Sequence, residues 1–309
     1  MENTKEPVKV LYFVDRMLRG GIQTFVLENW RHMDHNKVQI DFLLLDDGNT
    51  YELEDTLRGL GSRIYKLKGI WVKKPNDFFS YRRAVDAFFK VHHDYRVVHL
   101  HSTSKNYMVL KCAKKYGIPV RIAHSHCNAF QTTSKAQILI GNLFKPLLKY
   151  YATDYFACSE DAGRWLFGEE KITVIKNAVD IDKYRYEPIK ADCMRKKLKL
   201  DGKKVVGHVG RFTYQKNHTF LIDIFKELVE LDSDYRLLLI GEGALEEQIK
   251  IKAKTYGVEN KIIFAGFKSN VEDYMQAMDL FVFPSESEGL GLVLIEAQAA
   301  GLPCYTSEK

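Results

Sequence analysis

Two basic and two acidic side chains in the last third of the sequence have the types and spacing to bind a phosphorylated, hydroxyl-rich ligand. Arg211 and Lys216 follow the apolar run "VVGHVG" and precede an amphipathic segment that begins near residue 217. A helix start favours anions through its dipole and its free N–H groups, so two cations there are unfavourable unless a phosphate joins them. We interpret Arg211 and Lys216 as ligands of a diphosphate, with a merely solvated pair as the alternative.

The two acids, Glu288 and Glu296, lie on either side of a small-residue turn that opens a helix pattern. A carboxylate repels a diphosphate but accepts paired hydrogen bonds from vicinal hydroxyls. If the helix begins near residue 291 or 292, Glu296 lies about one turn inside it and Glu288 lies in the loop before it. We expect both acids to bind sugar hydroxyls, although Glu288 could simply favour the helix dipole. The N–H groups between them should face the diphosphate, from Gly289, Leu290, Gly291 and Leu292.

Two His-x-His pairs in the first half of the chain close two strand-like runs. They are His99/His101 and His124/His126. Spacing of two residues on a strand places both members of a pair on one face. Four histidines suggest zinc, but no carboxylate or cysteine accompanies them at a recognisable spacing. We therefore predict no metal and no cofactor, with one or two of the histidines packed or capping and one facing the ligand.

Glycines follow two of the strand-like runs. Gly20 and Gly21 come after the first run, where a tight turn could aim N–H groups at a ligand. Gly241 and Gly243 belong to "GEGALEE", which lacks the third glycine of a dinucleotide-binding loop. They either let backbone approach a nucleotide or simply end the strand, and the sequence leaves both readings open.

Apolar, β-branched runs alternate with amphipathic segments along the whole chain. The first set covers residues 9–14, 39–45, 63–67, 97–101, 120–124, 155–159 and 173–176. After a polar stretch the alternation restarts with "VVGHVG", "YRLLLIG", "KIIFAG", "LFVFP" and "LPCYTS". Such alternation predicts parallel sheets covered by helices on both faces. We expect an α/β protein with two doubly wound domains, residues 1–180 and 181–309, which face each other across a ligand-binding cleft.

The formal charge of +6 is concentrated in the first domain. Residues 1–180 carry 27 Lys and Arg against 20 Asp and Glu, whereas the remainder carries 19 against 20. Residues 58–83 alone contain eight basic residues, one acid and several aromatic residues. This mixture suits an anionic membrane surface, and a solvated basic face is the alternative. No nucleic-acid-binding motif accompanies it.

The sequence predicts a cytoplasmic protein. Its longest apolar stretches fall far short of the roughly 20 residues that span a bilayer. The N-terminal residues lack the basic start and apolar core of a secretory signal. The chain could still lie peripherally on the inner face of the plasma membrane.

The motifs together resemble those of retaining glycosyltransferases of family 4, which have the GT-B fold of two Rossmann-like domains. The specific part is "GRFTYQKN", "LLLIGEG", "FAGF", "VEDYMQAMDLFVFPS" and "EGLGLVLIEA", in the family's order and spacing. The last of these contains the E-x7-E signature, here Glu288 and Glu296. The motifs "VRIAHSHCN" and "CSEDAGRWLFG" further resemble the branch that builds capsules and exopolysaccharides.

The resemblance implies a role for each motif residue. Arg211 and Lys216 would clamp the diphosphate of the donor, Glu296 would bind its ribose and Glu288 its sugar. The base would stack near Phe267 and the segment from Val271 to Tyr274. The active-site histidine follows the fifth strand, so it would be His126 or His124, and we favour His126.

The family resemblance also implies a reaction. It is metal-independent transfer of a hexose, with retention, from a nucleotide-sugar, and we favour a UDP-sugar as the donor and a lipid-linked saccharide as the acceptor. Alternatives are a nucleotide-sugar epimerase or hydrolase on the same fold, and a non-catalytic protein that binds nucleotide or a partner. Family members normally continue past the "GLPC" strand, so we expect the C-terminal domain to be incomplete here.

Overall fold

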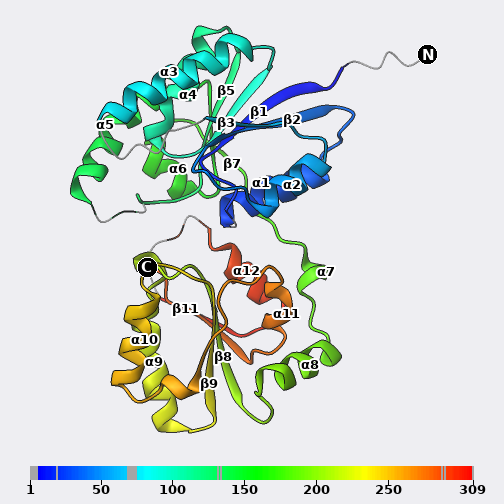
Figure 1. The fold of residues 1–309 in the computed structure, drawn as a ribbon, viewed down its shortest axis with the longest axis vertical. Coiled ribbons are helices and arrows are strands. Elements are labelled where there is room, and N and C mark those ends of the chain that lie inside the picture. Colours follow the sequence, from blue (N-terminus) through cyan, green and yellow to red (C-terminus); the bar gives the residue numbers. More distant parts are fainter. Residues whose placement is uncertain are drawn as a thin grey trace. The chain divides into compact units, whose positions relative to one another are not determined.

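The computed structural model describes residues 6–18, 20–67, 75–130, 132, 134–286, 288 and 290–307, with the backbone alone at 75–77. These residues form two compact units, Met1–Asn177 and Ala178–Lys309, and each is described here by itself. The division falls three residues before the boundary that we expected from the sequence. The chain is an α/β protein with a parallel sheet in each unit, as predicted (Figure 1).

Unit 1 is built on a seven-stranded parallel sheet in the order β3-β2-β1-β4-β5-β6-β7. Its strands are β1 Val8–Val14, β2 Val38–Leu45, β3 Ile64–Leu67, β4 Val97–His101, β5 Val120–Ser125, β6 Asp154–Ala157 and β7 Thr173–Val174. Its helices are α1 Gly21–His32, α2 Glu52–Gly59, α3 Pro75–Val91, η1 Ser104–Asn106, α4 Tyr107–Lys115, α5 Lys135–Tyr151 and α6 Glu160–Phe167. All seven strand-like runs of the first half therefore form strands.

Both faces of the unit 1 sheet are buried, because successive side chains of each strand point to opposite faces. Leu11 and Phe13 of β1 pack with residues of α3, α4 and α6. Val10 and Tyr12 of the same strand pack with α1 and α2 on the other face. The continuous apolar runs of the sequence follow from this double coverage.

Unit 2 repeats the plan with a five-stranded parallel sheet in the order β10-β9-β8-β11-β12. Its strands are β8 Lys204–Val209, β9 Tyr235–Ile240, β10 Ile262–Phe264, β11 Leu280–Phe283 and β12 Cys304–Thr306. Its helices are α7 Ile181–Tyr184, α8 Pro188–Leu198, η2 Tyr214–Lys216, α9 His218–Leu231, α10 Glu246–Thr255, η3 Glu259–Lys261, α11 Val271–Met275 and α12 Leu292–Ala299. Helices α9 and α10 cover one face, and α7, α8, α11 and α12 cover the other.

The strand order reverses direction once in each sheet. In unit 1 the reversal lies between β1 and β4, and in unit 2 it lies between β8 and β11. Loops that leave neighbouring strands at such a point go to opposite faces, which opens a crevice at the carboxyl ends of the strands. Residues of the sequence motifs follow these strands, since Gly20 comes after β1, Lys216 after β8 and Glu288 after β11. Among the described residues, no helix has both the length and the apolar character needed to cross a membrane.

Candidate functional site

The loops that follow β8 and β11 are joined to each other at the reversal point of unit 2. The N–H of Glu286 donates to the carbonyl oxygen of Gln215 at 2.8 Å. The side-chain amide of Asn217 donates to Glu286 Oε1, also at 2.8 Å. Asn217 has a left-handed backbone (φ 49°) and caps α9 by accepting from the N–H of Phe220. The first loop is therefore held in place by the second.

Lys216 and Glu288 meet across these two loops. Lys216 Nζ donates to Glu288 Oε1 at 2.7 Å, and the side chains are 18% and 23% exposed. The ammonium also lies 4.8 Å from the ring centre of Phe283. One predicted cation and one predicted acid are thus brought together, as a partly exposed ion pair.

Helix α12 begins where the sequence placed it, at Leu292, and Gly291 is its N-cap. A Cβ added at Gly291 would lie 3.0 Å from the ring of Phe283, so a glycine fits the close approach of this loop to β11. The first N–H groups of the helix have no carbonyl partner inside it. Leu290 is half-buried and Leu292 buried, whereas Gly289 lies outside the described residues.

Glu296 lies one turn inside α12, as predicted from its spacing to the helix start. Burial raises the pKa of its carboxyl, and a hydrogen bond with Tyr184 opposes that shift. Arg211 is exposed in the loop that leads to Lys216. Sequence reasoning missed Asn217, Glu286 and Tyr184, although an asparagine directly before an amphipathic segment is a recognisable helix cap.

A close contact between two loops explains why glycine occupies positions 241 and 243. A Cβ at Gly241, whose φ is +136°, would lie 2.1 Å from the carbonyl oxygen of Gly210. A Cβ at Gly243 would lie 2.5 Å from the carbonyl oxygen of Phe212. Backbone hydrogen bonds join the same segments, from Phe212 N to Glu242 O and from Leu245 N to Phe212 O. These glycines let the loop after β9 lie directly against the loop that carries Arg211.

The residues that we expected near the base differ in how far a ligand could reach them. Phe267 is exposed, and its N–H donates to Glu242 Oε1 at 3.1 Å. Val271 is half-buried at the start of α11. Tyr274, however, is buried in the core of unit 2, so the prediction that it contacts the base is wrong. Lys197 Nζ of α8 lies 5.8 Å from the centre of its ring.

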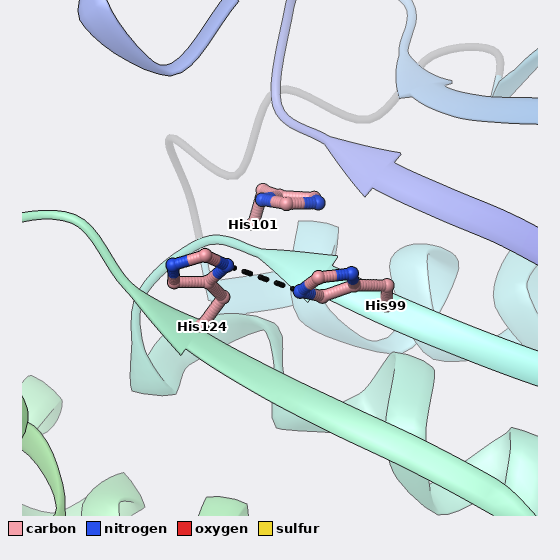
Figure 2. A group of neighbouring side chains, drawn as sticks. All are labelled: His99, His101 and His124. Atoms are coloured by element: carbon pink, nitrogen blue, oxygen red, sulfur yellow. Dashed lines mark hydrogen bonds between the residues drawn. The ribbon is translucent and has the colours of Figure 1, made fainter. Parts of the chain in front are cut away.

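The four histidines of unit 1 form two stacked, hydrogen-bonded layers at the carboxyl ends of β4 and β5. His99 Nε2 and His124 Nδ1 are 3.1 Å apart in one layer. His101 Nδ1 and His126 Nε2 are 2.9 Å apart in the other. The ring centroids of His99 and His101 are 4.0 Å apart, and so are those of His124 and His126. Figure 2 shows His101 lying over the bonded pair of His99 and His124.

One ring nitrogen from each of His99, His101 and His124 lies within 4.8 Å of the other two, so these residues could approach a metal ion. The ring planes of His99 and His124 are nearly parallel, at 9° to each other, and Nε2 of His99 faces Nδ1 of His124. Lone pairs of imidazole lie in the ring plane, and a tetrahedral zinc needs them directed at one common point. In the observed arrangement the nitrogens of two rings face each other, one pair in each layer. This geometry fits hydrogen bonds between histidines better than coordination of one metal ion.

The two candidates for the active-site histidine differ in the exposed fraction of their side chains. His124 is fully buried, and burial holds its pKa well below the usual range. A side chain that no solvent reaches cannot contact a substrate, so His124 is a packed residue. His126 keeps part of its surface exposed, although burial lowers the pKa of its imidazole to about 3 as well. His126 therefore stays our prediction for the active-site histidine.

The glycine pair after β1 does not form the expected tight turn. Gly20 is extended, with φ 178° and ψ 174°, and Gly21 is already the first residue of α1. An extended backbone needs no glycine, so the local conformation does not explain the pair. Gly20 caps α1 through its carbonyl oxygen, which accepts from Thr24 N at 2.9 Å.

Comparison with known proteins places the chain in a family. The model of Glycosyltransferase Family 4 matches residues 19–183, and that of the group 1 glycosyl transferases matches residues 190–309. The first match covers more than half of the chain. The chain belongs to glycosyltransferase family 4, and it is a glycosyltransferase.

Individual relatives agree with this assignment. The Bacillus subtilis protein EpsF, which its name assigns to the glycosyltransferases, is 33% identical over 97% of this chain and 79% of its own length. An Escherichia coli α-1,3-galactosyltransferase, named for UDP-Gal and a GlcNAc-diphosphoundecaprenol acceptor, is 24% identical over 99% of this chain and 81% of its own. Anabaena HepE in complex with UDP and glucose has a TM-score of 0.78 at 20% identity, over 96% of this chain and 80% of its own. The fold is therefore of the GT-B type.

Proposed function

We propose that this protein transfers a hexose from a UDP-sugar to a lipid-linked saccharide, with retention of anomeric configuration. The observation that carries the proposal is the Lys216–Glu288 pair at the reversal point of unit 2, one loop away from the N-terminus of α12. This position combines a cation, the N-terminus of a helix and carboxylates. A nucleoside diphosphate joined to a sugar needs all three kinds of partner.

Each side chain would have a defined part in the reaction. Lys216 and Arg211 would neutralise the departing diphosphate, a task that a divalent ion performs in other enzymes, so we expect turnover without metal. Glu296 would accept hydrogen bonds from the ribose and Glu288 from the donor sugar. The acceptor oxygen would bond to the anomeric carbon from the face that the diphosphate leaves, and its proton would pass to the diphosphate.

The names of relatives support the proposed acceptor. Two of them are named for diphosphoundecaprenol-linked saccharides, the E. coli galactosyltransferase and a Campylobacter jejuni N-acetylgalactosaminyltransferase that is 30% identical over 42% of this chain. A Staphylococcus aureus capsular polysaccharide glycosyltransferase is 29% identical over 61% of it. We infer a role in capsule or exopolysaccharide assembly at a membrane surface.

Calorimetric titration with nucleotides tests the donor part of the proposal. UDP should bind to the protein in the presence of a chelator, and UMP should bind more weakly because it lacks the second phosphate. GDP is the control for base preference. Binding of UMP and UDP with equal affinity would show that no diphosphate site exists, and it would contradict the roles of Lys216 and Arg211.

A further inference from the structure

Helix α5 of unit 1 leaves a row of apolar side chains in contact with solvent. Leu139, Leu143 and Tyr150 are 61%, 63% and 67% exposed, and Ile140 and Leu147 are exposed beside them. Spacings of four, four and three residues place 139, 143, 147 and 150 on one side of the helix. The opposite side is buried through Gly141 and Leu148. Isolated exposed leucines are common, but a continuous row indicates a surface that meets an apolar partner.

The helices next to α5 carry a strongly basic pocket. It is lined by Arg82, Arg83 and Asp86 of α3, by Met108, Lys111, Cys112, Lys114 and Lys115 of α4, and by Tyr151. Lys115 pairs with Asp86 at 2.6 Å. Among the described side chains, no carboxylate lies within ion-pair distance of Arg82, Arg83, Lys111 or Lys114. The chain from residue 95 to 153 contains nine basic residues and no acidic one.

The apolar row and the basic pocket are parts of one surface. Lys114 Nζ lies 4.4 Å from the ring centre of Tyr150, which ends the row. Lys111 and Lys114 also lie near the ring of Tyr151. An amphipathic helix that lies in a bilayer interface has this composition, because its apolar side enters the acyl boundary while cations contact lipid phosphates.

We propose that this surface, formed by the apolar row of α5 and the basic pocket of α3 and α4, docks on an anionic phospholipid membrane. The proposal deepens the proposed function and rests on it, since an acceptor linked to a lipid must be reached at a membrane. Leucines 139 and 143 would enter the acyl boundary, and Arg82, Arg83, Lys111 and Lys114 would lie at the level of the phosphates.

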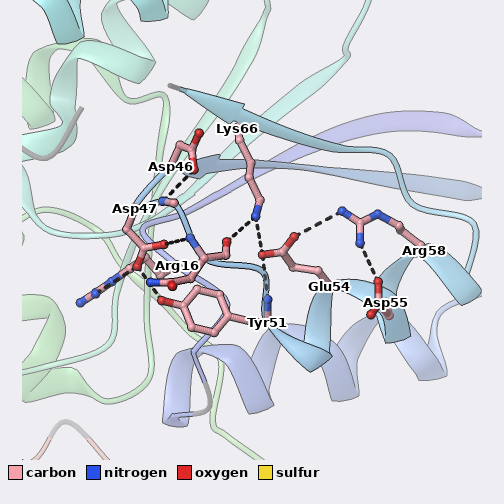
Figure 3. A network of polar contacts seen from close by, with 10 residues as sticks. Arg16, Asp46, Asp47, Tyr51, Glu54, Asp55, Arg58 and Lys66 are labelled. Carbon is pink, nitrogen blue, oxygen red and sulfur yellow. Dashed lines mark hydrogen bonds and ion pairs between the residues drawn. The ribbon is translucent and has the colours of Figure 1, made fainter. Parts of the chain in front are cut away.

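The proposal moves the membrane contact away from most of the segment predicted from the sequence, residues 58–83. Arg58 pairs with Asp55 at 2.7 Å, and Lys66 pairs with Glu54 at 2.9 Å (Figure 3). Tyr81 is buried and donates a hydrogen bond to Asn106. Residues 68–74 lie outside the described part of the chain. Of that segment, only the end that contains Arg82 and Arg83 belongs to the proposed surface.

Vesicle sedimentation tests the proposal. The full chain should sediment with vesicles of phosphatidylcholine and phosphatidylglycerol at low salt, but not with pure phosphatidylcholine. Leu139→Asn/Leu143→Asn should weaken binding at least about tenfold at every salt concentration, because it removes apolar area that enters the bilayer. Arg82→Gln/Arg83→Gln should weaken binding about tenfold at low salt and flatten its salt dependence.

Matched double variants in unit 2 serve as controls. Ile189→Asn/Ile251→Asn removes two exposed apolar side chains, and Lys226→Gln/Lys250→Gln removes two charges. Both should bind vesicles within about twofold of the unaltered protein. The proposal is overturned if the unaltered protein does not sediment, or if the unit 1 variants bind as well as the controls. It is also overturned if Leu139→Asn/Leu143→Asn abolishes a dimer in solution, since a second copy would then cover the row.

UDP binding by calorimetry, measured on the same variants, separates the two proposals. Every variant should bind UDP as the unaltered protein does, because none changes the loops after β8 and β11. UDP binding without vesicle binding would overturn only the membrane surface. Vesicle binding without UDP binding would overturn only the proposed donor site.

Discussion

At the scale of single residues, the ion pair between Lys216 and Glu288 gives the two side chains opposite expected effects on nucleotide binding. In the absence of ligand each charge compensates the other at 2.7 Å. A diphosphate needs the cation, whereas the acid competes for it. Because both side chains are partly exposed, the pair itself contributes only about 1 kcal/mol or less to the free energy of unfolding.

Lys216→Ala and Glu288→Gln should therefore have different effects on the affinity for UDP. Loss of the lysine should weaken UDP binding about 10- to 100-fold, the effect of one charge-assisted hydrogen bond, with little change in thermal stability. Loss of the acid should leave UDP binding equal or slightly tighter, and it should slow sugar transfer. Calorimetry and a transfer assay measure both effects. Equal loss of UDP affinity in the two variants would contradict the account, and Lys226→Ala is the control for a distant lysine.

His126 is the second residue whose chemistry depends on a neighbour. The Nε2 atom of His101 is buried without a partner among the described residues, while its Nδ1 faces His126. A buried N–H without an acceptor costs more than a buried lone pair, so we expect the His101 proton on Nδ1, donated to His126 Nε2. His126 would then carry its own proton on Nδ1.

Replacement of His101 tests that arrangement. His101→Asn retains an amide near the place of Nδ1, whereas His101→Phe retains only the ring. We expect turnover to fall about tenfold or more in the phenylalanine variant, as for other residues that orient an active-site histidine, and to be largely kept in the asparagine variant. Nitrogen NMR shifts of His126 should report the same tautomer in the asparagine variant alone. Equal turnover in both variants would show that His101 has only a packing role.

At the scale of elements, the loops at the ends of β8, β9 and β11 form one assembly around the candidate site. Gly241 and Gly243 allow the loop after β9 to touch the loop after β8, which in turn is bound to the loop after β11. The position of Lys216 thus depends on residues that touch no ligand. A substitution in these glycines should act on both stability and binding.

Gly243→Ala makes this dependence measurable. The new Cβ would lie 2.5 Å from one backbone atom of Phe212 and 2.8 Å from another, and backbone cannot move aside as a flexible side chain can. We expect a loss of about 2–4 kcal/mol in the free energy of unfolding of unit 2. Gly59→Ala is the control, because nothing lies within 4 Å of its added Cβ at the end of α2. If both variants unfold alike in denaturant, the close approach of the loops is not important for stability.

The sequence predicted the elements well because local patterns determine them. Alternating apolar runs predicted every strand, and the spacing of Glu288 and Glu296 around small residues predicted the start of α12. Contacts that depend on strand register were not predictable. His99 meets His124 because β4 and β5 pair with Val97 opposite Val120, and no local pattern encodes that register. The buried position of Tyr274 was missed for a different reason, since a five-residue helix has too few turns to define an apolar face.

The proposed basic surface of unit 1 overlaps only in part with the segment named in the sequence analysis. Residues 58–83 contain a dense group of basic residues, but acids of α2 form ion pairs with Arg58 and Lys66. The stretch from 95 to 153 has no acid of its own, so its cations can pair only with acids from other segments, as Lys115 does with Asp86 and Lys149 with Glu170. The spacing of 139, 143 and 147 would have been read as a buried helix side, and only the structure places it outside.

At the scale of the whole molecule, buried histidines link stability to pH. Burial lowers the pKa of His99 to about 3 and that of His218 to about 4. Their pKa in the unfolded chain is about 6.5. Between these values the unfolded chain binds more protons than the folded one, so acid favours unfolding. The contribution is fully present above about pH 6.5, and it is lost as the pH falls toward 4.

The free energy of unfolding of unit 1 should therefore fall between pH 7 and pH 5. Each such histidine contributes up to about 1.4 kcal/mol per pH unit once the pH is below 6.5. Tryptophan fluorescence in urea follows unit 1 selectively, because Trp30, Trp71 and Trp165 all belong to it. A free energy that does not change over this range would mean that the histidine stack is protonated in the folded protein.

The central claim is sugar transfer at the site that contains Lys216 and Glu288, and product analysis tests it most directly. UDP- and GDP-sugars are incubated with the protein and a diphosphoundecaprenol-linked saccharide, and mass spectrometry then measures both products. The account predicts one UDP released for each hexose added to the acceptor, with transfer slowed at least about 100-fold by Lys216→Ala. Release of nucleoside diphosphate that does not depend on the acceptor, or transfer undiminished in the Lys216 variant, would contradict it.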